Sequence, residues 1–295
     1  MLIETFLHVP GIGEHREKEL WERGVRTWRD AAASRLESIP FLEEVIGQSL
    51  SALALGDWWT VARALAPVEH WRALCREVDA AVRPLRWLAL DIETTGLAPP
   101  DCHVTVVGLC GHATRFQPTA LVAEGPEWKD RLRALLAESD ILITFNGRRF
   151  DVPFLASSLG WDESRFPPFH VDLYYLWKRL GERGGLKKIQ VRLLGRREGE
   201  LADVDGYTAV KLWHAHRRGV RGALDTLVRY CLEDVVVLLE LARLGYDRAA
   251  MQLGREWQCW NPPAVSLRHL PYDGDLVRHI QGPGGYAWWQ RYRPS

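Results

Sequence analysis

The sequence predicts an α/β protein in which a mixed β-sheet is covered by helices and preceded by a helical region. Two observations carry this prediction. Short, strongly apolar segments cluster between residues 86 and 145, whereas apolar residues recur at helical spacing before and after them. The 295 residues are 47% hydrophobic and 26% charged, which is typical of a globular protein with a substantial core.

Charge and cysteine content exclude several classes of protein. The 38 basic and 38 acidic residues cancel, which excludes nucleic-acid binding by net charge alone but not by a local basic surface. No apolar run approaches the roughly 18 residues of a membrane span, and the first residues lack the pattern of a signal peptide. The five cysteines form no C-x-x-C pair. A disulfide scaffold and a cysteine-ligated zinc site are therefore not expected, and we expect a cytoplasmic protein.

Residues 1–83 are expected to form a helical region that ends near Pro84. Apolar residues recur at helical spacing in three stretches, 20–28, 35–55 and 58–65, and prolines at positions 10, 40, 67 and 84 punctuate the region. The segment 9–13 (VPGIG) resembles the hairpin of a helix-hairpin-helix motif, whose backbone amides would contact a phosphate. Glu14 stands where a basic residue would favour such binding. A simple turn between two helices is the alternative, and the sequence leaves both open.

Residues 84–246 are expected to form the α/β domain. Apolar runs predict strands at 86–92, 104–110 and 141–145 and one ending at 120–123, and helical periodicity predicts a helix at 127–138. The following residues are expected to be mainly helical. Strands first, and then a helix before a further strand, favour a mixed sheet covered by helices.

Residues 247–295 are rich in proline and aromatic residues. We expect this extension to pack irregularly on the domain rather than to fold independently. Its last aromatic residues, Trp288, Trp289 and Tyr292, would either be buried against the domain or stack on nucleic-acid bases.

The strongest functional signal is the segment 91–96 (DIETTG), which follows an apolar strand. Asp91 and Glu93 project from the same face of that strand. Two neighbouring carboxylates at a buried strand end repel each other and lose hydration, and a divalent cation removes that penalty. Hard oxygen ligands suit Mg²⁺ or Mn²⁺. We therefore predict a cation site here rather than a solvated acidic strand end.

Two further segments carry carboxylates. In 146–151 (NGRRFD), Asn146 and the following glycine make a turn after a strand, and Asp151 opens a helix, where it would either cap that helix or join the site. In 230–234 (YCLED), Tyr230 and Asp234 share one helix face at the edge of an apolar stripe. Taken alone, this last pair is a weak signal.

In this order and at these separations, the three segments resemble the exonuclease motifs of the DEDD superfamily, and the tyrosine is similar to that of its DEDDy branch. The second and third also resemble the proofreading domains of B-family DNA polymerases. The overall pattern resembles the YprB-like family of ribonuclease H-like proteins, and it includes three more segments: 170–173 (HVDL), 184–189 (GGLKKI) and 205–213 (DGYTAVKLW). The resemblance covers most of residues 84–246. It implies a ribonuclease H-like sheet, two divalent cations and phosphodiester hydrolysis, usually from the 3′ end.

The resemblance also implies roles for individual residues. Two Mg²⁺ or Mn²⁺ ions, about 3.5–4 Å apart, would be held by Asp91, Glu93, Asp151 and Asp234. Tyr230 would orient the attacking water, because a tyrosine hydroxyl donates and accepts hydrogen bonds but is a poor base at neutral pH. The terminal nucleotide would contact Thr94, Thr95, Gly96, Leu97, Asn146 and Phe150. Asp172 has a weaker claim, since the HVDL match is also explained by strand-end structure.

Residues 176–229 contain 13 basic and six acidic residues, a local net charge of +7. This excess either follows a nucleic-acid backbone or forms a solvated helical face, and the sequence leaves both open. Within it, Lys187 and Lys188 follow two glycines that would open a helix, and they are candidate phosphate contacts.

We therefore predict a metal-dependent 3′–5′ exonuclease that acts on single-stranded 3′ ends of DNA or RNA. Two alternatives remain, a catalytically silent nucleic-acid-binding module and a structure-selective endonuclease on the same fold. A silent module has no need for the complete set of acids and Tyr230. Circular single-stranded DNA separates the two nuclease types, because an exonuclease requires an end.

Overall fold

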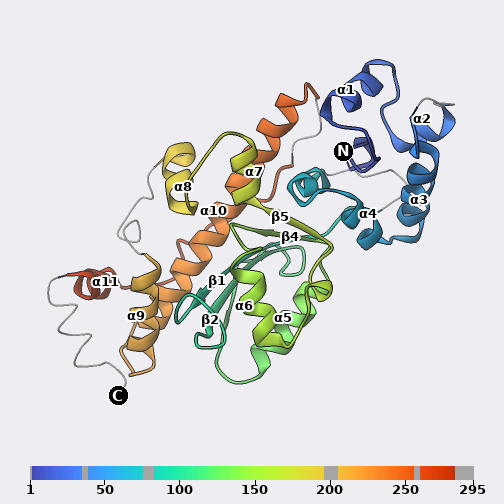
Figure 1. The fold of residues 1–295 in the computed structure, drawn as a ribbon. Coiled ribbons are helices and arrows are strands. Elements are labelled where there is room, and N and C mark those ends of the chain that lie inside the picture. Colours follow the sequence, from blue (N-terminus) through green and yellow to red (C-terminus); the bar gives the residue numbers. More distant parts are fainter. Residues whose placement is uncertain (1, 35–38, 76–82, 196–204, 256–259, 283–295) are drawn as a thin grey trace.

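The computed structural model describes residues 2–34, 39–75, 83–195, 205–255 and 260–282. Its centre is a five-stranded sheet with the strand order β3-β2-β1-β4-β5 (Figure 1). The strands are β1 Trp87–Thr94, β2 Val104–Gly111, β3 Thr119–Val122, β4 Ile141–Thr144 and β5 Phe169–Asp172. Strand β2 pairs antiparallel with β1 and β3, whereas β1, β4 and β5 are parallel. The predicted mixed sheet is thus confirmed.

The edge strand β5 is missing from the sequence prediction, which expects mainly helix after residue 151. Its four residues, FHVD, are too few and too mixed in polarity to produce a strand period. The strand forms because its backbone pairs with β4 from Phe169 to Asp172. The sequence analysis allows strand-end structure at HVDL but does not predict this strand within its mainly helical segment, because the deciding contact is a tertiary one that a local pattern does not contain.

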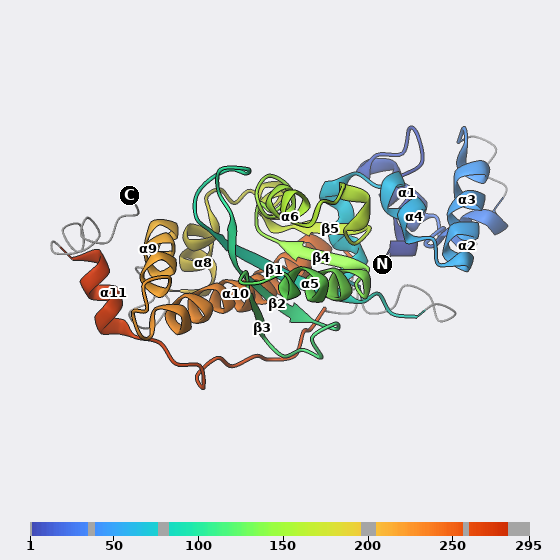
Figure 2. The ribbon, with the colours of Figure 1, turned by 90° about the horizontal axis from the view of Figure 1, so that it is seen from below.

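Helices cover both faces of the sheet (Figures 1 and 2). On one face lie α5 (Glu127–Ala137) and α6 (Asp151–Leu159). On the other face lies the long helix α10 (Ala223–Gln252), which packs against β1 and β2. The chain reaches α10 through α7 (Leu173–Arg179), α8 (Leu186–Leu194) and α9 (Gly206–His216).

Side chains of β1 alternate between these two layers. Leu88 and Leu90 belong to the apolar cluster beneath α5 and α6, whereas Ala89 belongs to the core on the opposite side. Because side chains alternate along a strand, Asp91 and Glu93 share the side of Ala89 and point toward α10. The strand period therefore decides which helix the acidic pair meets.

The N-terminal region is helical, as predicted. Its α-helices are α1 Glu14–Glu22, α2 Trp28–Ala33, α3 Leu42–Leu55 and α4 Trp58–Ala64. Two 3₁₀ helices flank them, η1 Leu2–Glu4 and η2 Pro67–Leu74. The expected helix over 35–55 begins only at Leu42, after Pro40, and residues 35–38 lie outside the described residues.

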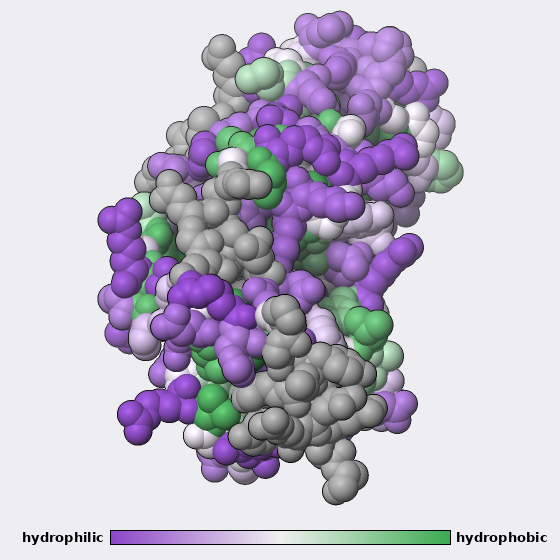
Figure 3. Space-filling model, turned by 90° about the vertical axis from the view of Figure 1, so that its left-hand side faces the viewer, coloured by the Kyte–Doolittle hydropathy of each residue, from purple (hydrophilic) through white to green (hydrophobic). Residues whose placement is uncertain are grey.

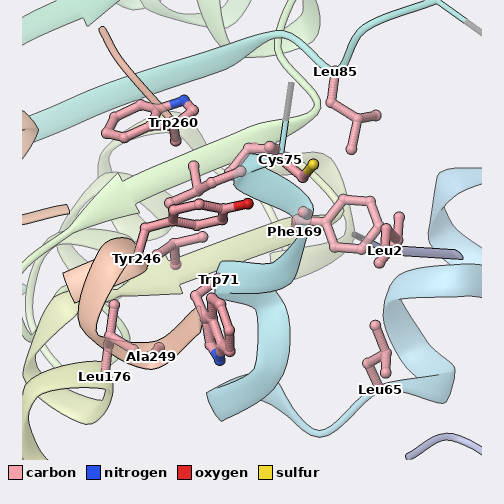
Figure 4. Close-up of a cluster of buried hydrophobic side chains, with 14 of the residues drawn as sticks. Leu2, Leu65, Trp71, Cys75, Leu85, Phe169, Leu176, Tyr246, Ala249 and Trp260 are labelled. Carbon is pink, nitrogen blue, oxygen red and sulfur yellow. The ribbon is translucent and has the colours of Figure 1, made fainter. Parts of the chain in front are cut away.

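One apolar core joins the N-terminal region to the sheet and to α10 (Figure 4). The ring of Trp71 in η2 packs edge-on against Tyr246 of α10, with 5.8 Å between the ring centres. Phe169 of β5 belongs to the same cluster as Leu2 and Leu65 of the N-terminal region. The core is therefore continuous across the boundary expected near Pro84.

Buried ion pairs reinforce this junction. The guanidinium of Arg72 is fully buried and pairs with Glu17 at 3.0 Å and with Glu69 at 2.9 Å. From α7, Arg179 pairs with Glu69 at 3.1 Å and also with Glu14. A buried charge is tolerated only when it is compensated, so α1, η2 and α7 are held in one arrangement.

The C-terminal extension packs on the domain in part as a regular element. Helix α10 continues beyond Tyr246 to Gln252, and Trp260 packs edge-on against Trp87 of β1 with ring centres 5.2 Å apart. Helix α11 (Gly274–Gln281) buries its apolar side in a cluster shared with α9. Trp288, Trp289 and Tyr292 lie outside the described residues. No helix in the described ranges is both long and apolar enough for a bilayer.

Candidate active site

The acidic pair of β1 sits where β1 pairs with β2. Glu93 is buried and Asp91 is half-buried. Asp91 lies opposite Gly108 of β2, and a Cβ atom at Gly108 would come within 2.9 Å of the Cys231 sulfur. Glycine at position 108 therefore allows α10 to approach the sheet closely enough to face the acidic pair.

Helix α10 brings Cys231 and Asp234 to this pair. One ligand atom each from Asp91, Glu93 and Cys231 lies within 4.8 Å of the other two. The Cys231 thiol is 4.0 Å from Asp91 Oδ2. Its pKa is raised well above the usual range, first by burial and then by the negative charges of Asp91, Glu93 and Asp234. The buried carboxyl of Asp234 therefore belongs to the same acidic cluster.

Asp151, at the start of α6, contacts the backbone of β1. Its carboxyl accepts a hydrogen bond from the backbone N–H of Ile92, which lies between the two acids of β1. Burial raises the pKa of Asp151 to about 7, the charge of Asp172 adds to this effect, and backbone N–H donors oppose it. The N-cap of α6 is Phe150, and no side chain caps this end. The alternative that Asp151 serves as the helix cap is thus not supported.

The turn that delivers Asp151 is organised by Asp172. Asn146 adopts a left-handed backbone conformation (φ 61°), and a Cβ atom at Gly147 would lie 2.2 Å from the Thr144 hydroxyl. The carboxylate of Asp172 accepts the N–H groups of Asn146 at 2.7 Å and Arg148 at 3.1 Å. It also accepts the N–H of Tyr174 at the start of α7. This pattern agrees with the strand-end interpretation of Asp172.

The residues expected to contact a terminal nucleotide continue β1. Thr94 donates to the carbonyl of Gly96 at 2.6 Å, and Thr95 accepts the N–H of His103 at 2.9 Å. Leu97 follows with 88% of its surface exposed. A large apolar side chain held in solvent beside a polar site is a suitable contact for a base or sugar.

The other expected contacts lie on two separate elements. Phe150 is half-buried, and its ring packs on Phe154 with centres 4.9 Å apart. Helix α8 places the Lys187 ammonium 4.9 Å from the centre of the Tyr230 ring, and Tyr230 itself is buried. Lys188 is exposed. Lys187, but not Lys188, therefore has a described contact with a residue of the third motif.

Several basic side chains of residues 176–229 already have partners within the protein. Arg192 pairs with Glu182, Arg217 with Glu124 and Arg229 with Glu233. Lys211 is buried and donates to the carbonyl of Ile280. Arg196 and Arg197 lie outside the described residues. Hydrophilic side chains nonetheless predominate on the face viewed in Figure 3, so both interpretations of the basic segment stay open.

The VPGIG segment forms a tight turn before α1. Gly11 has a positive φ of 80°, and its carbonyl accepts a hydrogen bond from Arg16 at 2.9 Å. Val9 and Ile12 are buried. The element before the turn is the 3₁₀ helix η1 rather than an α-helix, and Glu14 pairs with Arg179. Phosphate binding by this turn stays a prediction.

Comparison with protein families assigns the central region to a known superfamily. A model of the RNase H superfamily matches residues 88–246, more than half of the chain. The chain belongs to the RNase H superfamily. This RNase H-like domain runs from β1 into α10, so it contains all three acidic segments, and it indicates a hydrolase of the nuclease class with a nucleic-acid substrate. The match does not distinguish the DEDDy branch or the YprB-like family. No curated protein matches the chain.

The donor set of the RNase H-like domain fits a divalent cation. The four acids are Asp91, Glu93, Asp151 and Asp234, of which the last three are buried. Carboxylates of one sign gathered out of water repel each other, and a cation stabilises their charged forms. Oxygen donors suit Mg²⁺ or Mn²⁺, whereas the Cys231 sulfur is a soft donor. From the sequence, Cys231 is assigned only to an apolar stripe, because no local signal relates it to a strand 140 residues earlier.

Proposed function

We propose that this protein is a 3′–5′ exonuclease of the DEDDy type that hydrolyses single-stranded nucleic acid. The observation that carries the proposal is the approach of acids from three separate elements to the end of β1. The β1 acids cluster with the side chains of α10, and Asp151 of α6 bonds to the backbone of Ile92 between them. This is the arrangement that the resemblance to the DEDD motifs requires.

The residues of the site would have separate roles in the reaction. Asp91, Glu93, Asp151 and Asp234 would hold two divalent cations, which supply an activated water and stabilise charge on the leaving oxygen when bound. Tyr230, four residues before Asp234 on α10, would hydrogen-bond the attacking water and fix its direction.

Neighbouring groups would hold the substrate. Lys187, whose ammonium lies beside the Tyr230 ring, would offer a positive charge to a phosphate. The exposed side chain of Leu97 would pack on the terminal nucleotide. Asn146 and Phe150, on the turn that precedes α6, would bound the same pocket. A cluster of carboxylates repels a polyanion, so these contacts and the cations are both required.

The test is a digest of 5′-end-labelled single-stranded DNA and RNA with Mg²⁺ or Mn²⁺. We expect a ladder that shortens from the 3′ end, and no such ladder with Asp91→Asn. Asp130→Asn is the matched control, because it removes an exposed carboxylate that pairs with Arg133 on α5. Equal rates for Asp91→Asn and the wild type would reject the metal assignment.

The same assay separates the alternatives. Cleavage of circular single-stranded DNA would identify an endonuclease. Binding of both labelled strands without any product, with either cation, would identify a silent binding module.

A further inference from the structure

A cavity lies where the N-terminal region meets the edge of the sheet. It encloses about 380 Å³, within the range of small-molecule sites. The residues that matter for its chemistry are Trp59, Arg63, His70, Arg148, Pro167 and His170. We call it the seam cavity. None of the acids near the end of β1 lines it, and its wall includes Leu142, which belongs to the layer of α5 and α6.

The seam cavity favours an anion. Arg63 and Arg148 are the charged residues of its described lining, which contains no carboxylate. Burial lowers the pKa of His70 to about 4 and that of His170 well below the usual range. Both imidazoles are therefore neutral at pH 7, and the net charge of the lining is positive.

The same cavity offers a flat apolar surface. The half-buried Trp59 carries the Arg63 guanidinium over its ring, 5.1 Å from the centre. Phe166, Pro167 and Pro168 form the neighbouring wall. Because Arg63 lies over the Trp59 ring and Arg148 lines the same cavity, the site is suited to a ligand that combines a negative group with a planar ring able to pack on the rest of the indole and the proline wall.

Hydrogen bonds hold three residues of the wall, and one of these bonds joins the N-terminal region to strand β5. His70 Nε2 lies 3.0 Å from the Ala62 carbonyl, and its Nδ1 accepts the N–H of His170 at 3.0 Å. The ring of His170 contacts the Thr144 hydroxyl at 2.8 Å, and Arg148 donates to the His170 carbonyl at 3.2 Å. These contacts fix His70, His170 and Arg148, so this part of the wall is preorganised.

We propose that the seam cavity binds a nucleotide unit, with its phosphate at Arg63 and Arg148 and its base against Trp59. The unit is either part of a nucleic-acid strand or a free mononucleotide, since both present the same chemistry. The carboxylates of an acidic peptide would pair with the two arginines, but they would provide no planar ring to pack against the aromatic and proline wall. This site is separate from the acidic cluster and does not depend on its catalysing a reaction.

The test is calorimetric titration of the full chain with AMP in EDTA, which keeps divalent cations from the acidic cluster. We expect binding to the wild type. In Arg63→Ala it should be about tenfold weaker, the loss expected for one charge-assisted hydrogen bond. Trp59→Leu should weaken AMP but not inorganic phosphate. Arg23→Ala, which removes an exposed arginine outside the cavity, should bind as the wild type does. Circular dichroism verifies that each variant is folded.

Competition identifies the source of the ligand. Displacement of AMP by a single-stranded oligonucleotide points to a strand site, and failure of that displacement points to a free-nucleotide site. The proposal is overturned if AMP does not bind at millimolar concentration, or if it binds Arg63→Ala and Trp59→Leu as it binds the wild type. It is also overturned if an acidic peptide binds and AMP does not compete. These outcomes are independent of nuclease activity.

Discussion

Two clusters of buried charge in this protein differ in sign balance. Near the end of β1, the carboxylates of Asp91, Glu93 and Asp234 surround the Cys231 thiol, and Asp151 of α6 bonds to the backbone of Ile92. At the junction of η2 with α1 and α7, Arg72 and Arg179 alternate with glutamates. In the second cluster, opposite charges neutralise each other and hold the elements together. In the first cluster, all charges are negative, and a bound cation would relieve their mutual repulsion. Sign balance therefore distinguishes a structural cluster from a site that fits a ligand.

The largest expected effect comes from the like-charged cluster. Asp234→Asn should lower nuclease activity at least about 100-fold, because it removes a charge on which cation binding depends. Its stability in EDTA should not fall, since the change relieves repulsion between carboxyls. The measurements are a timed digest and urea denaturation.

A neighbouring acid supplies the control for this change. Glu233 is half-buried and pairs with Arg229 at 2.8 Å. Glu233→Gln should keep activity within about twofold, because this carboxylate pairs with Arg229 and has no assigned part in cation binding. Similar losses of activity in Asp234→Asn and Glu233→Gln would mean that Asp234 is not the acid through which α10 contributes to the site.

In the compensated cluster, removal of one charge should lower the stability of the protein. Arg72→Ala leaves the buried Glu17 without this partner and should lower the free energy of unfolding by about 3 kcal/mol or more. Arg86→Ala breaks a partly exposed pair with Glu138 and should lower it by less than about 1 kcal/mol. Urea denaturation of both variants measures the difference. Equal losses would refute the structural role of the buried network.

The spacing between β2 and α10 can be tested through glycine. Gly108→Ala places a Cβ atom 2.9 Å from Cys231 Sγ and 3.3 Å from the Cys231 carbonyl, so α10 must shift. We expect a loss of about 1–3 kcal/mol from overpacking, with a reduction of nuclease activity. Gly47→Ala is the control, because Gly47 lies within α3 with open space around it. An unchanged activity for Gly108→Ala would show that the acidic cluster tolerates this displacement.

The smallest expected effect concerns acid sensitivity of the N-terminal region. His8 packs beside Trp28, and burial lowers its pKa to about 4. In the unfolded chain His8 is protonated below about pH 6.5, whereas in the folded protein it stays neutral down to about pH 4. The contribution of His8 to the free energy of unfolding therefore falls as the pH falls from 7 to 5. This histidine contributes about 1–2 kcal/mol to that loss.

His8→Phe should therefore flatten the decline in unfolding free energy between pH 7 and 5. His15→Phe, on the exposed side of α1, should leave the decline as it is in the wild type. Urea denaturation at the two pH values provides the measurement. A steep decline in His8→Phe equal to that of the wild type would assign the acid sensitivity to other groups.

Much of the fold is predictable because its signals are local. The strands β1, β2 and β4 and helix α5 begin and end within two residues of the expected positions. Their apolar runs and turns are contained in short windows of sequence. Strand β5 is not predictable in this way, because only its pairing with β4 makes it a strand. For the same reason, the sequence does not indicate the ion pairs of Arg72, whose partner Glu17 lies 55 residues away.

The candidate site divides in the same way. The resemblance of three sequence segments to the DEDD motifs is what singles out Asp91, Glu93, Asp151, Tyr230 and Asp234 as the predicted set. Contacts between distant segments are needed for everything around them: the approach of the α10 thiol to β1, the carboxylate that supports the turn before α6, and the seam cavity.

Local sequence is enough to establish which strand carries two acids on one side and which helix carries Tyr230 and Asp234 on one face. These properties follow from the periods of single elements. The meeting of β1, α6 and α10 at one point, and the closing of a cavity over the sheet edge by the N-terminal region, exist only in the folded chain. Packing and hydrogen bonds between remote segments set those distances, and no local period encodes them.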